Sequence, residues 1–208
     1  MSYSLNEVLS ITDSETFAHR YMAILEKESE GNVLLAELIL CMDDLEHAKP
    51  SWFDKFNAAV IVDFLTISHR HYLRTVLPSI ERQLDIFTKQ QDCPALISEF
   101  GLYFFRQFRS GLISHFKYEE EQLFPAALEM LDSSETSFDA ENFKAHHPHS
   151  LVDLNGLMML MNSNRDTEER SMSHRILIEK LNSLNKELSL HEFIEDGVLL
   201  ERLNPTLD

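Results

Sequence analysis

Residues that interrupt helices are scarce in this sequence. It contains five glycines and six prolines among 208 residues, about half of their usual frequency. This scarcity favours long helices and argues against a β-sandwich or a glycine-rich nucleotide-binding fold. Hydrophobic residues (44%) and charged residues (25%) occur at ordinary globular levels, which excludes wholesale disorder. We therefore expect an all-α protein that is long enough to bury a sizeable core.

Cysteines and long apolar runs are also rare. Cys41 and Cys93 are the only cysteines and form no CxxC motif, so a reduced cytoplasmic protein is the simpler interpretation. The longest apolar runs, such as residues 38–42 and 58–62, are far shorter than the ~20 residues that span a bilayer. The first ten residues lack the basic and apolar regions of a signal peptide. We expect a cytoplasmic location and no membrane partner.

Positive charge is in short supply. Lysine and arginine number 18 against 35 aspartates and glutamates, which gives a net charge of −17. A chain of this charge repels phosphate, so nucleic acids and anionic membrane surfaces are excluded as expected partners.

Four long helical stretches are predicted at about 57–90, 94–131, within 137–161 and within 171–203. Asn57 is a plausible N-cap, and Pro78 is expected to kink the first stretch. The breaks QQDCP (90–94), DSSETS (132–137) and NSNRDTEERS (162–171) are short and rich in turn residues. We predict an up-down-up-down four-helix bundle over residues 53–208.

Residues 1–52, with helices at 14–28 and 32–48, form a predicted N-terminal helical extension. The phenylalanine-rich stretch between residues 100 and 116 is expected in the core.

Two segments repeat an H-x3-E pattern, His115 with Glu119 and His191 with Glu195. Residues four apart share a helix face, so each pair can direct an imidazole nitrogen and a carboxylate oxygen at one point. Imidazole and carboxylate together are ligands for iron, manganese or zinc. Carboxylate-bridged two-metal sites in helix bundles use such pairs on facing helices.

The other two stretches also carry histidines, at positions 69 and 71 and at positions 146, 147 and 149. We take residues 69, 117, 147 and 193 as the centres of the four groups. If all four groups lie at one depth in an antiparallel bundle, the residue midway between two successive centres must lie in a turn. The midpoints are residues 93, 132 and 170, and all three lie in predicted breaks. This spacing supports convergence on one site, but it does not choose between neighbouring histidines.

Four segments resemble the motifs of hemerythrin-like (HHE) proteins, and in particular the repair-of-iron-centres (RIC) family. They are ISHRHYLRTVLP, HFKYEEEQLFPAAL, HHPHSLVDLNGL and LHEFIEDGVLLERL, in the family's order, within residues 57–203. The resemblance implies a left-handed four-helix bundle with two non-haem iron ions, bridged by carboxylates and an oxo or hydroxo group. The ligands it implies are His69, His115, Glu119, His147, His191 and Glu195. A manganese or mixed site would use the same ligands.

The sequence departs from the family pattern at several positions. Arg70 stands where the family's second histidine is usual. Pro148 follows His147 directly, so His146 and His149 remain alternative ligands. Asp196 is the alternative to Glu195. The N-terminal cysteine pair of RIC proteins is absent, because only Cys41 lies in that region.

The expected function is binding of small oxidants such as O2, NO or peroxide at a di-iron centre. The resemblance implies a role in nitrosative or oxidative stress, with iron–sulfur proteins as partners whose centres are repaired. The alternative is a module that senses or carries O2 or NO without turnover. A metal-free acidic helical scaffold and an oxidase or peroxidase are further readings, so whether the protein is an enzyme is left open.

Overall fold

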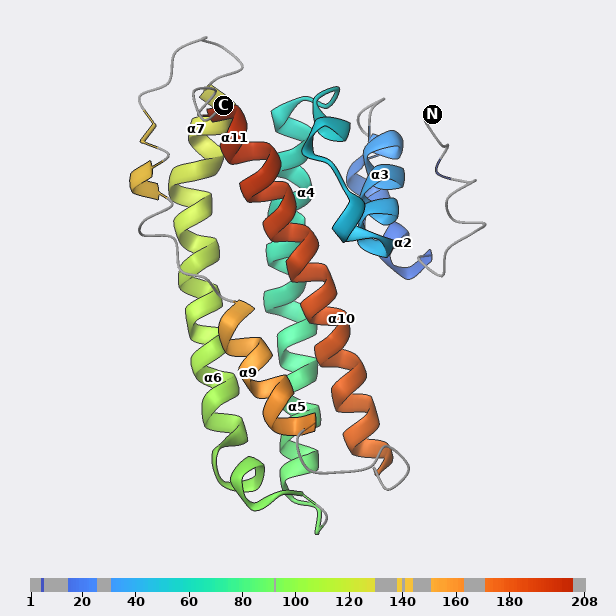
Figure 1. Ribbon diagram of the computed structural model, residues 1–208, viewed down its shortest axis with the longest axis vertical. Coiled ribbons are helices and arrows are strands. Elements are labelled where there is room, and N and C mark those ends of the chain that lie inside the picture. Colours follow the sequence, from blue (N-terminus) through green and yellow to red (C-terminus); the bar gives the residue numbers. More distant parts are fainter. Residues whose placement is uncertain are drawn as a thin grey trace. The chain divides into compact units, whose positions relative to one another are not determined.

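The computed structural model describes Leu5 and residues 15–25, 31–91, 93–129, 138–139, 141–143, 151–162 and 171–203. Regular structure in these residues is helical throughout, and no strand occurs among them (Figure 1). The all-α prediction is therefore confirmed for the described chain. None of the described helices is long and apolar enough to cross a membrane.

Three long helical runs match the predicted stretches closely. The first consists of α4 (Ala58–His71), η3 (Tyr72–Val76) and α5 (Leu77–Thr88). The second consists of α6 (Ala95–Tyr118), η4 (Glu119–Leu123) and α7 (Phe124–Glu129). The last consists of α10 (Met172–Ile194), η6 (Glu195–Leu200) and α11 (Glu201–Leu203). From the predicted third stretch, the structure describes α9 (Leu151–Asn162) and a short helical segment at 141–143.

The N-terminal region contains α2 (Glu15–Leu25), α3 (Gly31–Asp43) and the short 3-10 helices η1 (Leu45–His47) and η2 (Pro50–Phe53). The predicted helix at 32–48 was too long, because α3 ends at Asp43. The next residue, Asp44, leaves helical geometry, and its carboxylate lies 2.8 Å from His47 Nδ1. Aspartate competes with helix continuation through such local contacts. The predicted N-cap is confirmed, since Asn57 Oδ1 accepts a hydrogen bond from the Ala59 N–H at 2.8 Å.

The chain divides into two compact units. Unit 1 comprises Met1–Ser68, Glu120–Ala145 and Ser189–Asp208, and unit 2 comprises His69–Glu119 and His146–Leu188. The unit boundaries lie within α4, η4 and α10. The predicted division at residue 52 stays a prediction.

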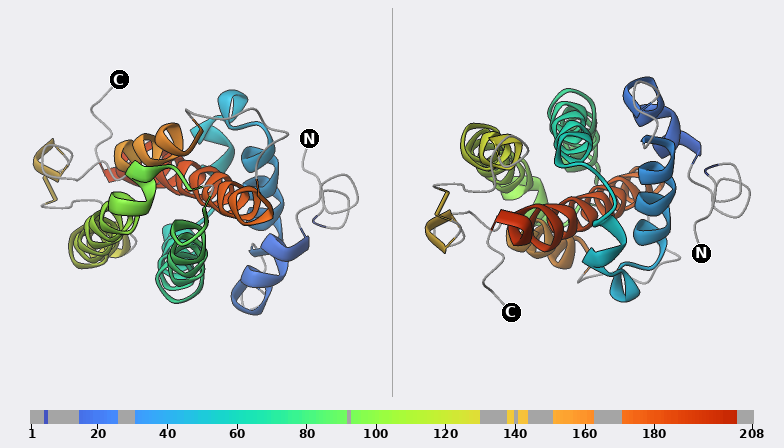
Figure 2. Two further views of the ribbon diagram at one scale, coloured as in Figure 1. Left: turned by 90° about the horizontal axis from the view of Figure 1, so that it is seen from below. Right: turned by 90° about the horizontal axis from the view of Figure 1, so that it is seen from above.

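Unit 2 has one apolar core to which α5, α6, α9 and α10 all contribute. Its members include Leu84, Phe105, Leu157 and Leu181, one from each helix. Figure 2 shows the backbone of these helices from below and from above. Polar contacts tie the same helices together at the edge, such as the hydrogen bond from Lys180 Nζ to Ser79 Oγ at 2.8 Å. Unit 2 therefore buries the apolar faces of four helices against one another.

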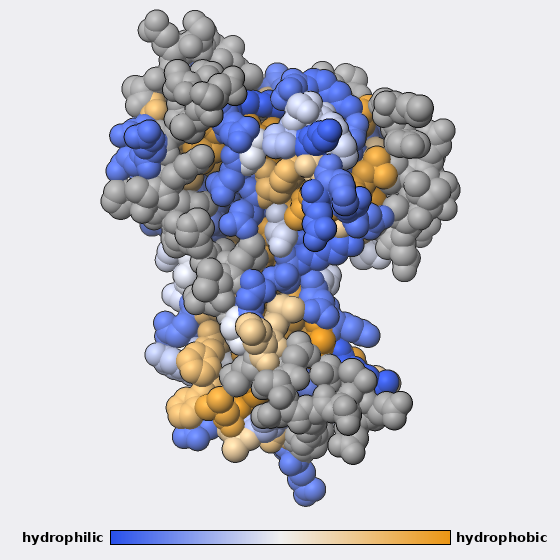
Figure 3. Space-filling view, viewed as in Figure 1, coloured by the Kyte–Doolittle hydropathy of each residue, from blue (hydrophilic) through white to orange (hydrophobic). Residues whose placement is uncertain are grey.

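The phenylalanine-rich stretch of α6 is only partly in that core. Phe105, Phe108 and Phe116 are buried, but Phe100 and Phe104 are 39% and 46% exposed. The expectation that the whole stretch is core was therefore wrong. Adjacent residues such as Phe104 and Phe105 point about 100° apart on a helix, so they cannot share one buried face. Hydrophobic side chains over α6 and α9 are visible at the surface in Figure 3.

Unit 1 packs the N-terminal helices against α4 through aromatic side chains. The ring of Tyr21 on α2 lies between those of Phe17 and Phe64, at centroid distances of 4.8 and 5.0 Å. Its buried hydroxyl lies 3.0 Å from Ser68 Oγ, and Ser68 in turn donates to the Phe64 carbonyl oxygen at 2.9 Å. A buried phenol is stable only with such a partner. The N-terminal region therefore contacts α4 one residue before His69.

Candidate metal centre

Five of the six predicted ligands lie in the described chain, and all five are buried. His69 lies in the last turn of α4, and His115 lies in the last turn of α6. Glu119 is the first residue of η4. His191 lies in the last turn of α10, and Glu195 is the first residue of η6. Their exposed fractions are 0–7%. The predicted ligand His147 and its alternatives His146 and His149 lie outside the described residues.

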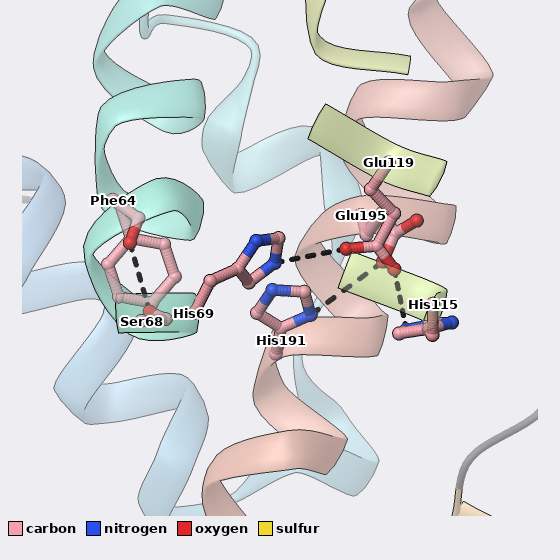
Figure 4. Close-up of polar contacts among 7 residues, drawn as sticks. All are labelled: Phe64, Ser68, His69, His115, Glu119, His191 and Glu195. Atoms are coloured by element: carbon pink, nitrogen blue, oxygen red, sulfur yellow. Dashed lines mark hydrogen bonds and ion pairs between the residues drawn. The ribbon is translucent and has the colours of Figure 1, made fainter. Parts of the chain in front are cut away.

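In unit 2 the structure brings His69, His115 and Glu119 together (Figure 4). His69 Nε2 lies 3.0 Å from Glu119 Oε2, and His115 Nε2 lies 2.5 Å from Glu119 Oε1. Each oxygen of one carboxylate thus faces a different imidazole, from a different helix. The neighbouring Glu120 and Glu121 are exposed, so Glu119 is the buried member of this acidic run.

Aromatic rings hold this cluster in a dry environment. The His69 ring stacks on Phe116 with a centroid distance of 3.9 Å and an interplanar angle of 11°. The Tyr72 ring also packs on Phe116, at a centroid distance of 6.0 Å. Tyr72 and Phe116 are each 1% exposed. His69 is fully buried, whereas the alternative His71 is only half-buried. The packing therefore orients the His69 imidazole toward Glu119.

In unit 1 the second H-x3-E pair is also buried, but its imidazole and carboxylate lie farther apart than those of His115 and Glu119. His191 Nδ1 lies 3.7 Å from Glu195 Oε2, and both side chains are at most 2% exposed. The alternative Asp196 is half-buried. The helical register thus places Glu195 rather than Asp196 on the buried side with His191.

Three π-helical turns accompany the candidate ligands. η3 begins three residues after His69, η4 begins at Glu119, and η6 begins at Glu195. In η3 the Leu77 N–H donates to the Tyr72 carbonyl oxygen, five residues back. Single π turns within α-helices are rare and are frequent at functional sites. Their position is a further indication of function that is independent of residue type.

Proline explains two of these turns. Pro78 follows the end of η3 by two residues, and Pro125 follows the end of η4 by two residues. A proline has no N–H and its ring clashes with the carbonyl four residues back. Those carbonyls belong to Arg74 and Glu121, both inside the π turns, where the wider helix relieves the clash. The kink expected at Pro78 is thus a π turn, and the repeated proline spacing was a signal that the sequence analysis missed.

The buried histidines and glutamates of the described chain form groups that could hold a metal ion. Imidazole nitrogens and carboxylate oxygens without a thiolate suit iron, manganese or zinc. Burial, with a smaller contribution from Glu37, raises the pKa of the Cys41 thiol in α3 to about 12, so it stays protonated at neutral pH. A buried carboxylate requires compensating positive charge, which a divalent cation supplies. The residues present therefore fit a metal ion.

Three further buried polar residues, Ser68, Ser173 and Glu187, were not singled out from the sequence. Glu187 lies one helical turn before His191 on α10 and is 8% exposed. Ser68 links Tyr21 to the turn that carries His69. His174 is also buried, and its ring stacks on Phe87 at a centroid distance of 4.8 Å.

Comparison with known proteins adds no assignment. No family model, no curated protein and no solved structure matches the chain. The functional argument therefore depends on the residues and their geometry.

Proposed function

We propose that this chain is a hemerythrin-like, non-haem di-iron protein that binds small oxidants such as O2, NO or peroxide. The observation that carries the proposal is the arrangement of Glu119. Its two carboxylate oxygens face the imidazoles of His69 and His115 separately. A carboxylate that bridges two metal ions needs this arrangement, because each ion takes one oxygen and one imidazole.

The remaining ligands complete the proposed pair of sites. His191 and Glu195, the buried pair of unit 1, are the further proposed ligands. His147 is the proposed sixth ligand on sequence grounds alone. Manganese would fit the same donors, and growth conditions decide between the metals.

The proposed framework is an up-down-up-down four-helix bundle with N-terminal helices added. It is supported by three helical runs that match the predicted stretches, and by an apolar core in unit 2 built from four helices. Di-iron carboxylate sites are built in the cores of such bundles.

An iron pair would supply redox chemistry and open coordination positions for a small ligand. The chain's own residues bind and orient the metal and exclude water. Phe116 stacks on the His69 ring and orients it, and Tyr72 packs on Phe116. Dry surroundings of this kind control solvent access and redox potential at metal sites.

The proposed cellular role is a response to nitrosative or oxidative stress in the cytoplasm, with iron–sulfur proteins as partners in repair. This role is supported by the motif resemblance alone, and fold by itself does not determine function. This role does not specify whether the protein catalyses a reaction or only binds its ligand.

The test is metal content per chain, measured on protein purified from iron-supplied cells. We expect about two irons per chain and a near-ultraviolet band that changes when azide or NO is added. The double variant Glu119→Ala, Glu195→Ala should retain the helical circular dichroism spectrum and lose both irons. Unchanged iron content in that variant would show that the assignment is wrong.

A second candidate function is O2 or NO sensing without turnover. It is favoured by the buried contact of Tyr21 with Ser68, which connects α2 to the residue before His69. Reversible O2 binding, together with a change in protease protection of α2 on binding, would support sensing. Steady-state peroxide consumption would instead indicate an enzyme.

A further inference from the structure

Unit 1 contains a cavity of about 280 Å³ that the proposed function does not use. Its apolar walls are Phe56, Ala127, Leu199 and Leu203, and the start of α4 at Asn57 and the side chain of Arg202 complete the lining. These residues come from three separate segments of unit 1. The cavity is thus a feature of the folded unit rather than of one helix.

Arg202 is held rigidly at this cavity. Its Nη1 donates to the Phe56 carbonyl oxygen at 2.9 Å, and its Nη2 donates to the Phe53 carbonyl oxygen at 2.5 Å. A guanidinium has five N–H donors in a fixed plane, so further donors remain after these two bonds. Burial lowers the pKa of Arg202, while the charge of Asp54 opposes that shift. The structure shows no carboxylate bonded to Arg202 among the residues that it describes.

The start of α4 adds a second positive feature. Asn57 caps this 14-residue helix, and Asn57 and Ala58 both line the cavity. The N-terminus of a helix carries partial positive charge and exposed N–H groups, which favour anions. Among the residues that the structure describes, no acidic side chain lines this cavity.

We infer that this cavity binds a small monocarboxylate with a short aliphatic tail. The carboxylate pairs with N–H groups of Arg202 that the two backbone carbonyls leave available, because charge-assisted hydrogen bonds to a guanidinium are strong. The tail lies against Leu199, Leu203 and Ala127. The inference does not depend on the proposed metal centre, since none of the five described candidate ligands lines the cavity.

The probe for this site is sodium hexanoate, titrated into the full-length protein by isothermal calorimetry at constant ionic strength. We expect saturable one-to-one binding with a Kd of about 1 mM, which is reasonable for eight heavy atoms. 1-Hexanol has the same tail without the charge, and formate has the charge without the tail. Both should bind at least tenfold more weakly. Equal binding of hexanol or of formate would overturn the inference.

Two variants test the location. Arg202→Met removes the charge and should abolish hexanoate binding, but it also releases two backbone carbonyls and could unfold the chain. Ala127→Leu keeps Arg202 and fills the cavity, so it should weaken hexanoate at least tenfold while the circular dichroism spectrum and metal content stay unchanged. Lys55→Met, which removes a surface cation of unit 1 outside the lining, is the matched charge control and should bind normally. Hexanoate binding to Ala127→Leu with wild-type affinity would overturn the assignment.

Discussion

The two H-x3-E segments have the same spacing but different geometry. Each ends an α-helix, and in each the glutamate is the first residue of a π turn. Glu119 contacts its own His115 at 2.5 Å and also His69 at 3.0 Å, whereas Glu195 lies 3.7 Å from His191. The i, i+4 spacing places a pair on one face, and the surrounding packing decides how closely the pair approaches.

An aromatic stack and a proline accompany the first segment. Phe116, one residue after His115, stacks on the second imidazole and holds it in place. The π turn after Glu119 is followed by Pro125, but the π turn after Glu195 contains Gly197 and no proline. We therefore expect the first segment to contribute more to metal affinity than the second.

The largest expected effect separates the two glutamates. Glu119→Ala removes the carboxylate that faces two imidazoles, so iron content should fall from about two per chain to near zero. Glu195→Ala removes the carboxylate of the more widely spaced pair, so about one iron should remain. Metal analysis by mass spectrometry of the purified variants measures the difference.

Glu120→Ala is the matched control for these variants. It removes an exposed carboxylate from the same acidic run and should retain about two irons. Equal loss of iron in Glu119→Ala and Glu195→Ala would mean that the two segments contribute equally, contrary to the proposed asymmetry.

A smaller effect is expected from Pro125→Ala. Alanine removes the steric cause of the π turn at η4, so Glu119 loses part of its fixed orientation while the fold survives. Outer-shell changes at metal sites typically cost about 10–100-fold in affinity, and we expect roughly tenfold for Fe(II). Competition with a chromophoric chelator measures this affinity.

Pro94→Ala makes the same substitution at the N-cap of α6, remote from Glu119 in sequence, and is the control. It should leave Fe(II) affinity unchanged. If Pro125→Ala also leaves the affinity unchanged, the proline does not set the geometry of Glu119.

The sequence was informative wherever a local rule applied. Helical periodicity located the long runs, and Asn57 was recognisable as an N-cap because its side chain can reach an N–H two residues on. The spacing of His115 and Glu119 placed both on one face. These are properties of a single helix, so they do not depend on the partner helices.

Other features depend on tertiary packing and could not be derived in that way. His69 and His71 point about 200° apart on a helix, and only the rotation of α4 determines which is buried. Phe104 and Phe105 are both apolar, so hydrophobicity alone does not tell which one faces the core. The π turns were missed because Pro78 was interpreted only as a cause of a kink, although Pro78 and Pro125 each stand two residues after a π turn.

A modest effect is expected from loss of the Tyr21 hydroxyl. Tyr21→Phe removes the hydrogen bond to Ser68 and keeps the ring that packs on Phe64. Such a bond contributes about 1 kcal/mol to the free energy of unfolding. Urea denaturation should show this loss with iron content unchanged, since Ser68 still donates to the Phe64 carbonyl. A Ser68→Ala variant and the double variant complete a mutant cycle, and additive effects would show that the pair does not interact.

The smallest effect concerns Glu81, which provides a surface counterpart to Glu119. Its carboxylate also meets two cationic groups, Arg106 Nε at 2.7 Å and Arg109 Nη1 at 2.8 Å, but these side chains are 63% and 36% exposed. The hydrogen bond from Arg106 is the main reason that the pKa of Glu81 lies below its usual 4.5. The unfolded chain therefore binds this proton more tightly, so the contribution to stability is complete above pH 4.5 and is lost as the pH falls through the lowered pKa.

Glu81→Gln should reduce the free energy of unfolding by about 0.5 kcal/mol at neutral pH, and by less as the solution is acidified. Urea denaturation of both proteins between about pH 7 and pH 3 measures this difference, and high salt should diminish it because exposed charges are screened. A difference that persists at low pH would mean that Glu81 stabilises the chain by packing rather than by charge.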